Sequence, residues 1–325
     1  MNKKNNKNNS DLHRARDSKK DEFYTQLSVI EKELKYYKHH FRDKVVYCNC
    51  DDPRSSNFFL YFSHNFETLG IKRLITTCYK SKDINLFSKN LSSSALRLEY
   101  NGDKNGDKIP NADEIGVYEL DGDGDFRSSE CIEILMQADI IVTNPPFSLF
   151  REYIDQLIQH GKQFLVLGNV NAITYKEIFQ LIKSNQLWLG ASISGGDIEF
   201  GVPDDYPLKA AGYRIDANGK KYIRVKGIRW FTNMDYISRN EDLILHRSFS
   251  YEDFPKYDNY DAIDISKTKN IPFDYDGHMG VPITFLDKYN PEQFEIIRFR
   301  KGNDNKDLCI NGKCPYFRII IKKKK

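Results

Sequence analysis

The chain reads Asp139-Ile140-Ile141-Val142-Thr143-Asn144-Pro145-Pro146-Phe147 near its middle, and this stretch decides the fold. The apolar, β-branched run 139–143 predicts a buried strand. The two prolines that follow fix the backbone and leave carbonyl groups without local partners. A rigid polar loop therefore follows the strand, at the place where an open α/β sheet presents its ligands.

Strands and amphipathic helices alternate on both sides of this strand. Further strands are expected at 44–50, 73–79, 163–170 and 187–189, and helices at 28–41, 52–69, 150–160 and 174–183. Capping boxes are expected at Ser28/Glu31 and at Thr174/Glu177. Such alternation implies parallel strands joined by right-handed crossovers, hence a doubly wound α/β sheet over about residues 20–190. Residues 80–113 have too weak a period for a prediction.

The composition is that of a compact globular protein. Hydrophobic residues make up 40% and aromatic residues 13% of the 325 residues, enough to build a large core. No apolar run approaches the roughly 20 residues of a membrane-spanning helix, and residues 1–9 contain no signal segment. A cytoplasmic protein without a membrane partner is therefore expected.

The six cysteines are scattered without a CxxC pair, and all are expected to be reduced thiols. A zinc site built from Cys48, Cys50, Cys309 and Cys314 is disfavoured because neither spacing is that of a zinc knuckle. The acidic run 121–125 has the look of a calcium loop, but Phe126 stands where the sixth position needs Gly. No metal site is therefore predicted.

Positive charge gathers in one segment, although the net charge is only +3. Seven Lys or Arg residues and one acidic residue lie between Pro207 and Trp230. Within this segment Ala217-Asn218-Gly219 predicts a hairpin turn between two basic strands. Because a two-stranded ribbon can enter the major groove of DNA, the candidates for DNA contact are Arg214, Lys221, Arg224 and Arg229. A solvated hairpin face explains any single one of them nearly as well.

The loop that follows the predicted strand 139–143 has the groups needed to hold a planar amino group. The lone pair of such an amine is delocalised into its ring, so hydrogen-bond acceptors must localise it before the nitrogen can attack. The side-chain oxygen of Asn144 and the carbonyl of Pro145 are acceptors of this kind, and Phe147 is suited to stack on an extracted base. A Pro-Pro turn beside a core Phe is the alternative interpretation, which the preceding strand disfavours.

Several segments together resemble the EcoRI-type adenine-specific DNA methyltransferases. They are 21–26, 47–53, 122–127, the loop 144–147 and 280–285, within a similarity that runs from Lys20 to Arg318. The resemblance implies a Rossmann-like fold, S-adenosylmethionine as the methyl donor, no metal, and double-stranded DNA as the substrate. It further implies a monomer that methylates N6 of adenine by base flipping, within a GAATTC-like palindrome, alongside a cognate restriction endonuclease for the same site.

The resemblance also assigns roles to individual residues. It implies catalysis by Asn144, Pro145, Pro146 and Phe147, and cofactor binding by Phe23, Tyr24, Thr25, Asp51, Asp52, Asp125 and Phe126. In this assignment Asp125 accepts a hydrogen bond from the adenine of the cofactor, and Asp51 and Asp52 either receive its ammonium group or cap a helix. The usual Gly-rich loop after the first strand is absent, and Cys48-Asn49-Cys50-Asp51 stands in its place.

The order of the motifs resembles the gamma arrangement of amino-methyltransferases. Beyond residue 190 the pattern changes to Gly-, Asp- and aromatic-rich segments with little helical period. The prediction is a disordered basic tail at 1–19, a catalytic and cofactor-binding domain at 20–190, and an α+β target-recognition and C-terminal region at 191–325. Two other functions stay open at this point. One is methylation of RNA or of a protein glutamine, and the other is DNA binding without catalysis.

Overall fold

A computed structural model describes residues 23–50, 56–78, 95–107, 109–192, 197–202, 212–300 and 308–324. The chain divides into two compact units. Unit 1 comprises Met1–Val170 and Ser194–Met234, and unit 2 comprises Asn171–Ile193 and Asp235–Lys325. Among the helices of the described residues, none combines the length and the apolar character needed to cross a membrane.

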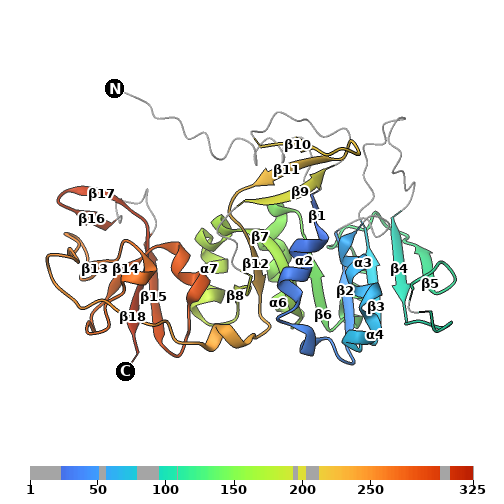
Figure 1. Cartoon of the computed structure of the whole chain (residues 1–325), viewed down its shortest axis with the longest axis horizontal. Coiled ribbons are helices and arrows are strands. Elements are labelled where there is room, and N and C mark those ends of the chain that lie inside the picture. The colour runs from blue at the N-terminus through green and yellow to red at the C-terminus, as the bar shows by residue number, and fades with distance from the viewer. Residues whose placement is uncertain are drawn as a thin grey trace. The chain divides into compact units, whose positions relative to one another are not determined.

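A large mixed sheet forms the centre of unit 1, in the strand order β5-β4-β3-β2-β6-β7-β12 (Figure 1). Its strands are β2 (Val45–Cys48), β3 (Arg73–Thr77), β4 (Leu96–Tyr100), β5 (Ile115–Glu119), β6 (Ile140–Thr143), β7 (Gln163–Asn169) and β12 (Ile228–Thr232). Strands β3, β2, β6 and β7 are parallel, and Tyr47 pairs with both Ile75 and Ile141. The predicted parallel core is therefore confirmed. Strands β4, β5 and β12 extend it in antiparallel pairing.

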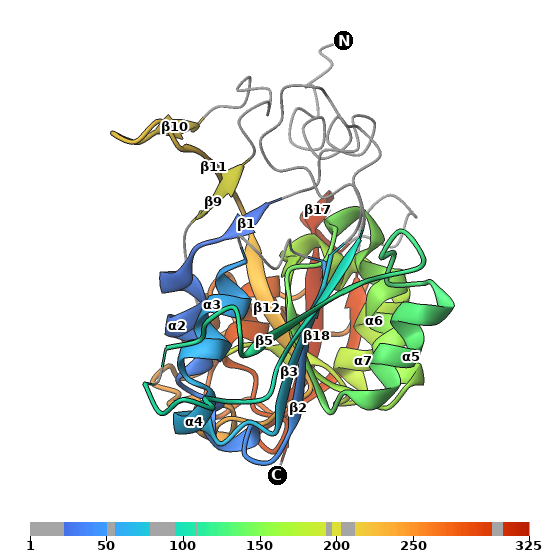
Figure 2. The same ribbon diagram turned by 90° about the vertical axis from the view of Figure 1, so that its right-hand side faces the viewer.

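Helices cover both faces of this parallel core, as Figure 2 shows. One face carries α2 (Leu27–Leu34), α3 (Asn57–His64) and α4 (Phe66–Leu69), and the other carries α5 (Ser129–Gln137) and α6 (Phe150–Gln159). All residues of β2 and β6 are buried. A strand covered on both faces must be apolar along its whole length, which explains the continuous apolar runs in the sequence.

Both predicted capping boxes are wrong. Helix α2 begins at Leu27 after an N-cap at Gln26, so Ser28 lies inside the helix. Helix α7 (Lys176–Lys183) has Tyr175 as its N-cap, and neither helix has a side-chain cap. The capping pattern is a local preference, whereas the N-cap residue Gln26 uses its side chain for a long-range bond to the Glu199 carbonyl. The predicted stop at Gly70 is confirmed, because this residue ends α4 in the left-handed conformation.

A second, smaller sheet in unit 1 has the order β1-β9-β11-β10 (Figure 1). It consists of β1 (Tyr24–Thr25), β9 (Ile198–Val202), β11 (Lys221–Val225) and β10 (Arg214–Ile215), all antiparallel. Arg214 pairs with Tyr222 and Ile215 with Lys221, so the predicted basic hairpin is confirmed. Strand β9 joins this hairpin to the N-terminal segment that β1 belongs to.

Unit 2 contains a sheet of order β13-β14-β18-β15 and a separate hairpin. Its elements are α7, β8 (Trp188–Leu189), β13 (Ile263–Asp264), β14 (Met279–Val281), β15 (Phe294–Arg300), β16 (Leu308–Ile310), β17 (Lys313–Tyr316) and β18 (Arg318–Lys323). Short 3-10 turns in the chain are η1 (Lys38–His40), η2 (Phe147–Leu149), η3 (Val170–Thr174), η4 (Ile237–Asn240), η5 (Thr268–Asn270) and η6 (Ile283–Lys288). Tyr257, Ala262, Leu308 and Ile320 form a buried cluster within the unit.

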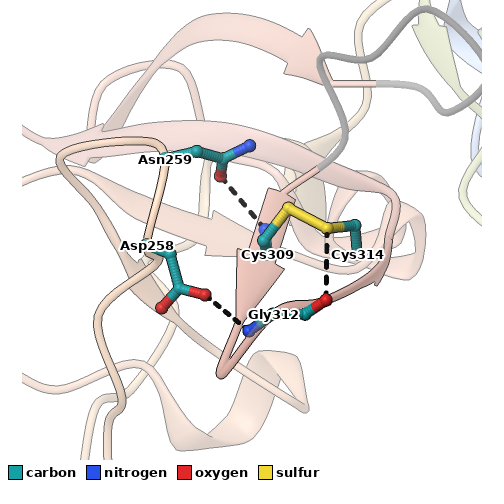
Figure 3. The surroundings of a disulfide bond; sticks show 5 residues. All are labelled: Asp258, Asn259, Cys309, Gly312 and Cys314. Atoms are coloured by element: carbon teal, nitrogen blue, oxygen red, sulfur yellow. Dashed lines mark hydrogen bonds between the residues drawn. A yellow bond between two sulfur atoms is a disulfide. The ribbon is translucent and has the colours of Figure 1, made fainter.

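Cys309 and Cys314 form a disulfide in the β16–β17 hairpin, which corrects the expectation that all six cysteines are thiols (Figure 3). The turn at Asn311-Gly312, with both residues at positive φ, brings the two Cα atoms 4.0 Å apart. Reasoning from the cellular compartment and from CxxC spacing does not detect such a cross-strand pair. Cys48, Cys50, Cys78 and Cys131 are thiols, as expected.

Candidate functional site

The strand order of the large sheet reverses between β2 and β6. From β2 the chain continues to β3 on one side, whereas β6 is followed by β7 on the other side. In open α/β sheets, ligands bind outside the carboxyl ends of the strands at such a reversal. Asn49 and Cys50 follow β2 at this edge, and the loop that starts at Asn144 follows β6.

Asn144 is buried, with 7% of its surface exposed. Its Nδ2 donates a 2.7 Å hydrogen bond to the Phe23 carbonyl. Because a carbonyl can only accept, this bond fixes which end of the amide is nitrogen. The Oδ1 atom is buried and has no hydrogen-bond donor among the described residues. A buried acceptor without a donor costs free energy, so this position is suited to a ligand that brings an N–H group.

Three aromatic rings gather around the same loop. The ring of Phe147 lies 5.7 Å from Phe23 and 6.4 Å from Phe200 between centroids, and Phe23 lies 5.8 Å from Phe200. Phe147 is half-buried, whereas Phe23 and Phe200 are buried. Pro145 is buried and Pro146 half-buried, so the loop holds the Phe147 ring at the rim of the site. Phe200 escaped the sequence prediction, although buried Ile198, Phe200 and Val202 alternate along β9.

Asn49 lies in the segment after β2 that stands in place of a Gly-rich loop. Its side-chain Oδ1 accepts a 2.5 Å hydrogen bond from the Tyr153 hydroxyl, and its carbonyl accepts one from Thr143 Oγ1. Burial raises the pKa of the Tyr153 hydroxyl well above its usual range, so this group stays protonated and donates. Cys50 has a φ of 75°, in the left-handed region that a glycine normally supplies. The turn after β2 therefore keeps a glycine-like backbone without a glycine.

The predicted cofactor residues fall into three groups. The first group is the segment 23–25, in which Phe23 and Thr25 are buried and Tyr24 is half-buried. It lies next to Asn144, whose side chain donates to the Phe23 carbonyl. Thr25 Oγ1 is buried and, like Asn144 Oδ1, has no partner among the described residues. Asp51 and Asp52 lie outside the described residues. Asp125 and Phe126 form the third group, in the loop between β5 and α5.

Phe126 connects this loop to the turn after β2. It is buried, and its ring packs edge-on against Tyr153 at 5.0 Å between centroids. The Phe126 carbonyl accepts a 3.1 Å hydrogen bond from Gln156 Nε2 on α6. Tyr153 thus touches both Phe126 and Asn49. Asn49 and Tyr153 therefore join the predicted groups at Phe126 and Asn144 to the reversal point. The sequence prediction missed these two residues because their importance depends on pairing between distant segments.

Asp125 is held by its neighbour Arg127. Its Oδ2 accepts a 2.6 Å hydrogen bond from Arg127 Nη2, and its Oδ1 accepts bonds of 2.9 Å from both Nε and the backbone N of Arg127. Hydrogen bonding by Arg127 lowers the pKa of the Asp125 carboxyl below its usual range, so the group stays an acceptor at neutral pH. An Asp and an Arg two positions apart are common in sequences, so the spacing alone does not predict this ion pair.

The four predicted DNA-contact residues do not form one group. Arg214, Lys221 and Arg224 lie on or beside the β10–β11 hairpin, whereas Arg229 lies on β12 in the large sheet. Arg214 and Arg224 both face Glu199 of β9. Arg229 Nη1 donates to the carbonyl of Ile228.

Comparisons with known proteins place the chain in a family. The family model described as "Adenine-specific methyltransferase EcoRI" matches residues 11–324. Type II methyltransferase M.EcoRI of Escherichia coli is 56% identical over 316 residues, which are 97% of this chain and 96% of that protein. Type II methyltransferases M.MgeORF184P of Mycoplasma genitalium and M.MpnI of Mycoplasma pneumoniae are 40% and 35% identical, each over 96% of this chain and 98% of the relative. No solved structure gives a significant match.

A family model that spans nearly the whole chain, together with relatives that match over almost their full lengths, is far more specific than a single loop motif. The α/β sheet, with the loop at Asn144 at its reversal point, is compatible with this assignment. The chain therefore belongs to the EcoRI family of adenine-specific DNA methyltransferases.

Proposed function

We propose that this chain transfers a methyl group from S-adenosylmethionine to N6 of an adenine flipped out of duplex DNA, within a GAATTC-like palindrome. The observation that carries the proposal is the buried Asn144 Oδ1, an acceptor for which the described part of the chain offers no donor, in the same loop as a half-buried aromatic ring. An adenine brings both an N–H group for the acceptor and a ring for the aromatic face. The sheet architecture and the edge at which the loop stands support a Rossmann-like methyltransferase fold.

The residues act on the amine by orientation. Asn144 Oδ1 and the Pro145 carbonyl accept the two N6 hydrogens, which directs the nitrogen lone pair away from the ring. Phe147 stacks on the adenine and is itself supported by Phe23 and Phe200. S-adenosylmethionine, when bound, supplies an electrophilic methyl group on a positive sulfur. Positioning of the neutral amine in a partly dry site is the main contribution of the protein, and no covalent enzyme nucleophile is needed.

The cofactor fits beside Asn144 in this proposal. Phe23, Tyr24 and Thr25 pack on its methionine end, and the buried Thr25 Oγ1, which has no partner within the described ranges, is a polar atom suited to a ligand there. Asp125 accepts from its adenine and Phe126 covers the ring. Asp51 and Asp52 remain proposed contacts to the ammonium group. No metal takes part.

Methyl transfer from tritium-labelled cofactor tests the function directly. Duplex DNA with GAATTC sites, RNA and protein extracts are offered in parallel, and the labelled DNA is digested to nucleosides. The expected product is N6-methyladenine in DNA, placed by sequencing of a methylated plasmid. Label in RNA or protein but not in DNA would overturn the substrate, and the absence of any transfer would leave a DNA-binding protein without catalysis.

Asp125→Ala should weaken cofactor binding about tenfold. A hydrogen bond from the adenine amine to the carboxylate is worth on the order of 1 kcal/mol, which corresponds to roughly that factor in affinity. Calorimetry with S-adenosylmethionine in the absence of DNA measures the change. Arg127→Gln is the matched control, because it breaks the same ion pair and keeps the carboxylate. An equal loss in both variants would mean that the pair only shapes the loop.

Phe147→Ala should chiefly impair the capture of the flipped base. Stacking on an aromatic face is worth roughly 1–3 kcal/mol per base, so methylation should slow by about 10- to 100-fold. With 2-aminopurine at the target position, fluorescence should rise less than with the wild-type protein. Phe147→Tyr keeps the ring face and should retain much of the activity. Loss of activity in the Tyr variant equal to that in the Ala variant would contradict a stacking role.

We also propose roles for the rest of the chain. Residues 20–190 carry the proposed catalytic and cofactor-binding residues, strands β9 and β12 complete that part within unit 1, and target recognition falls to the basic hairpin and the remaining C-terminal region. The protein acts as a monomer in the cell interior, where the DNA is, and protects sites that a cognate restriction endonuclease cleaves. Expression together with such an endonuclease tests the last point, because unprotected cells lose viability.

A further inference from the structure

Strand β9 carries one charged side chain toward the basic hairpin. Its Ile198, Phe200 and Val202 are buried, and Phe200 belongs to the aromatic group around the Asn144 loop. Glu199 alternates with these residues and is half-buried on the other face of the strand. Successive side chains of a strand point to opposite faces, so Glu199 lies next to the catalytic aromatic group in sequence but faces the hairpin.

Glu199 holds two of the proposed DNA-contact residues. Its Oε2 accepts a 2.6 Å bond from Arg214 Nη2, and its Oε1 accepts a 3.2 Å bond from Arg214 Nε. Arg224 Nε lies 3.9 Å from Oε1. The Arg214 guanidinium also lies over the Tyr222 ring, 4.3 Å from its centroid. Hydrogen bonding by Arg214 lowers the pKa of the Glu199 carboxyl below its usual range, so it is charged at neutral pH.

The same glutamate is tied to the N-terminal segment of the site. Gln26 Nε2 donates a 2.8 Å bond to the Glu199 carbonyl and a 3.3 Å bond to Oε2. Gln26 directly follows β1, which pairs with β9 through Thr25 and Phe200. Gln26 therefore holds the Glu199 backbone through the carbonyl and contacts the carboxylate through Oε2, which keeps the carboxylate opposite the arginines.

The paired arrangement makes DNA a competitor for Arg214. The forked contact with the carboxylate uses the same two-donor geometry with which arginine binds a phosphate or the O6 and N7 atoms of guanine. The side chain of Arg214 is 47% exposed and that of Glu199 is 20% exposed. An ion pair this exposed is weak because water screens it, so a well-placed set of DNA acceptors can displace the carboxylate, whereas a poorly placed set cannot compensate for the lost contact.

We propose that Glu199 is a specificity-determining residue that holds Arg214 and Arg224 in intramolecular contacts until duplex DNA with correctly placed acceptors draws them away. This inference rests on the proposed DNA substrate. On non-cognate DNA the negative carboxylate reduces the attraction between the basic hairpin and the phosphates, because no base edge there offers the arginines acceptors that replace it. The cognate site supplies the acceptors that compensate for the lost contact. Glu199 thus lowers affinity for nonspecific DNA more than for the cognate site.

Glu199→Gln tests this directly, because the amide keeps the shape and the backbone bond to Gln26 but removes the charge. Binding to cognate and scrambled duplexes is measured by fluorescence anisotropy over a series of salt concentrations. Release of the arginines should steepen the log–log salt dependence on scrambled DNA by about one unit per added phosphate contact. Affinity for scrambled DNA should rise about two- to fivefold and the cognate-to-scrambled ratio should fall.

Glu133→Gln is the matched control, since it removes the same charge from the exposed face of α5 in the same unit. It should leave the salt slope and the ratio at their wild-type values. In an Arg214→Gln background, the effect of Glu199→Gln should shrink because the main partner is gone. If Glu199→Gln matches Glu133→Gln, or acts undiminished in that background, the inference is overturned.

The failure of this inference is separable from failure of the proposed function. Wild-type protein that methylates adenine in duplex DNA while Glu199→Gln behaves as the control would refute only the role of Glu199. Wild-type protein that transfers no methyl group to DNA would refute the function itself. Circular dichroism of Glu199→Gln establishes that the variant is folded before either comparison is made.

Discussion

Asn144→Ala should reduce the turnover of methyl transfer by at least about 100- to 1,000-fold, while both S-adenosylmethionine and DNA still bind. The substitution removes the acceptor that directs the lone pair of the amine, and loss of one preorganised polar partner at a reacting group typically has an effect of this size. Binding should largely survive, because Phe147 and the proposed cofactor contacts at Asp125 and Phe126 keep their side chains, and only the bond from Asn144 to the Phe23 carbonyl is lost. The expected signature is a loss in kcat with nearly unchanged dissociation constants.

The steps separate with 2-aminopurine at the target position. Its fluorescence should rise on binding of Asn144→Ala, as with the wild-type protein, yet no methyl group should be transferred. Asn169→Ala is a suitable control, because it removes the same amide from the end of the neighbouring strand β7, where Nδ2 donates to the Lys226 carbonyl. That variant should keep its turnover. Near-normal turnover by folded Asn144→Ala would remove Asn144 from the catalytic role.

The sequence predicts the parallel core well because its signals are local. The apolar run that ends at Thr143 and the helical period after Phe150 are both visible within a dozen residues, and β6 and α6 lie there. Strand β12 is different. It pairs with β7 in antiparallel fashion, with Ile228 opposite Asn169. The segment Ser194–Met234, which contains β12, therefore returns to unit 1. No periodicity reports a partner some sixty residues away, so the antiparallel extension of the sheet was not predicted.

The same distinction applies to the site. Asn144 and Phe147 are conspicuous because two prolines between them follow a strand. Asn49 is held by Tyr153, 104 positions away, and Glu199 is held by Gln26, 173 positions away. A polar residue that matters only through a distant partner has no local pattern. The left-handed backbone of Cys50 is likewise invisible in sequence, because a glycine is the usual signal for it.

One glycine in the loop that carries Asp125 combines an unusual backbone conformation with close packing. Gly124 has a φ of 75°, and a Cβ atom there would overlap the carbonyl oxygen of Cys78, which follows β3. A rotamer change cannot relieve contact with a backbone atom, so the loop that carries Asp125 must move. Left-handed backbone with a side chain costs about 1–2 kcal/mol, and the displacement of packed backbone adds to this.

Gly124→Ala should therefore lower the free energy of unfolding by on the order of 3 kcal/mol and weaken cofactor binding more than Asp125→Ala does. Urea unfolding measures the first effect, and calorimetry on the folded variant at low temperature measures the second. Gly106→Ala is the matched control. Gly106 also has a positive φ, 83°, but nothing lies within 4 Å of its Cβ position, so it should lose only the backbone part, about 1 kcal/mol. Equal losses in the two variants would mean that the Cys78 contact yields easily. A larger loss for Gly124→Ala without a change in cofactor affinity would place Asp125 outside the cofactor site, because its loop cannot stay in place when Gly124 gains a side chain.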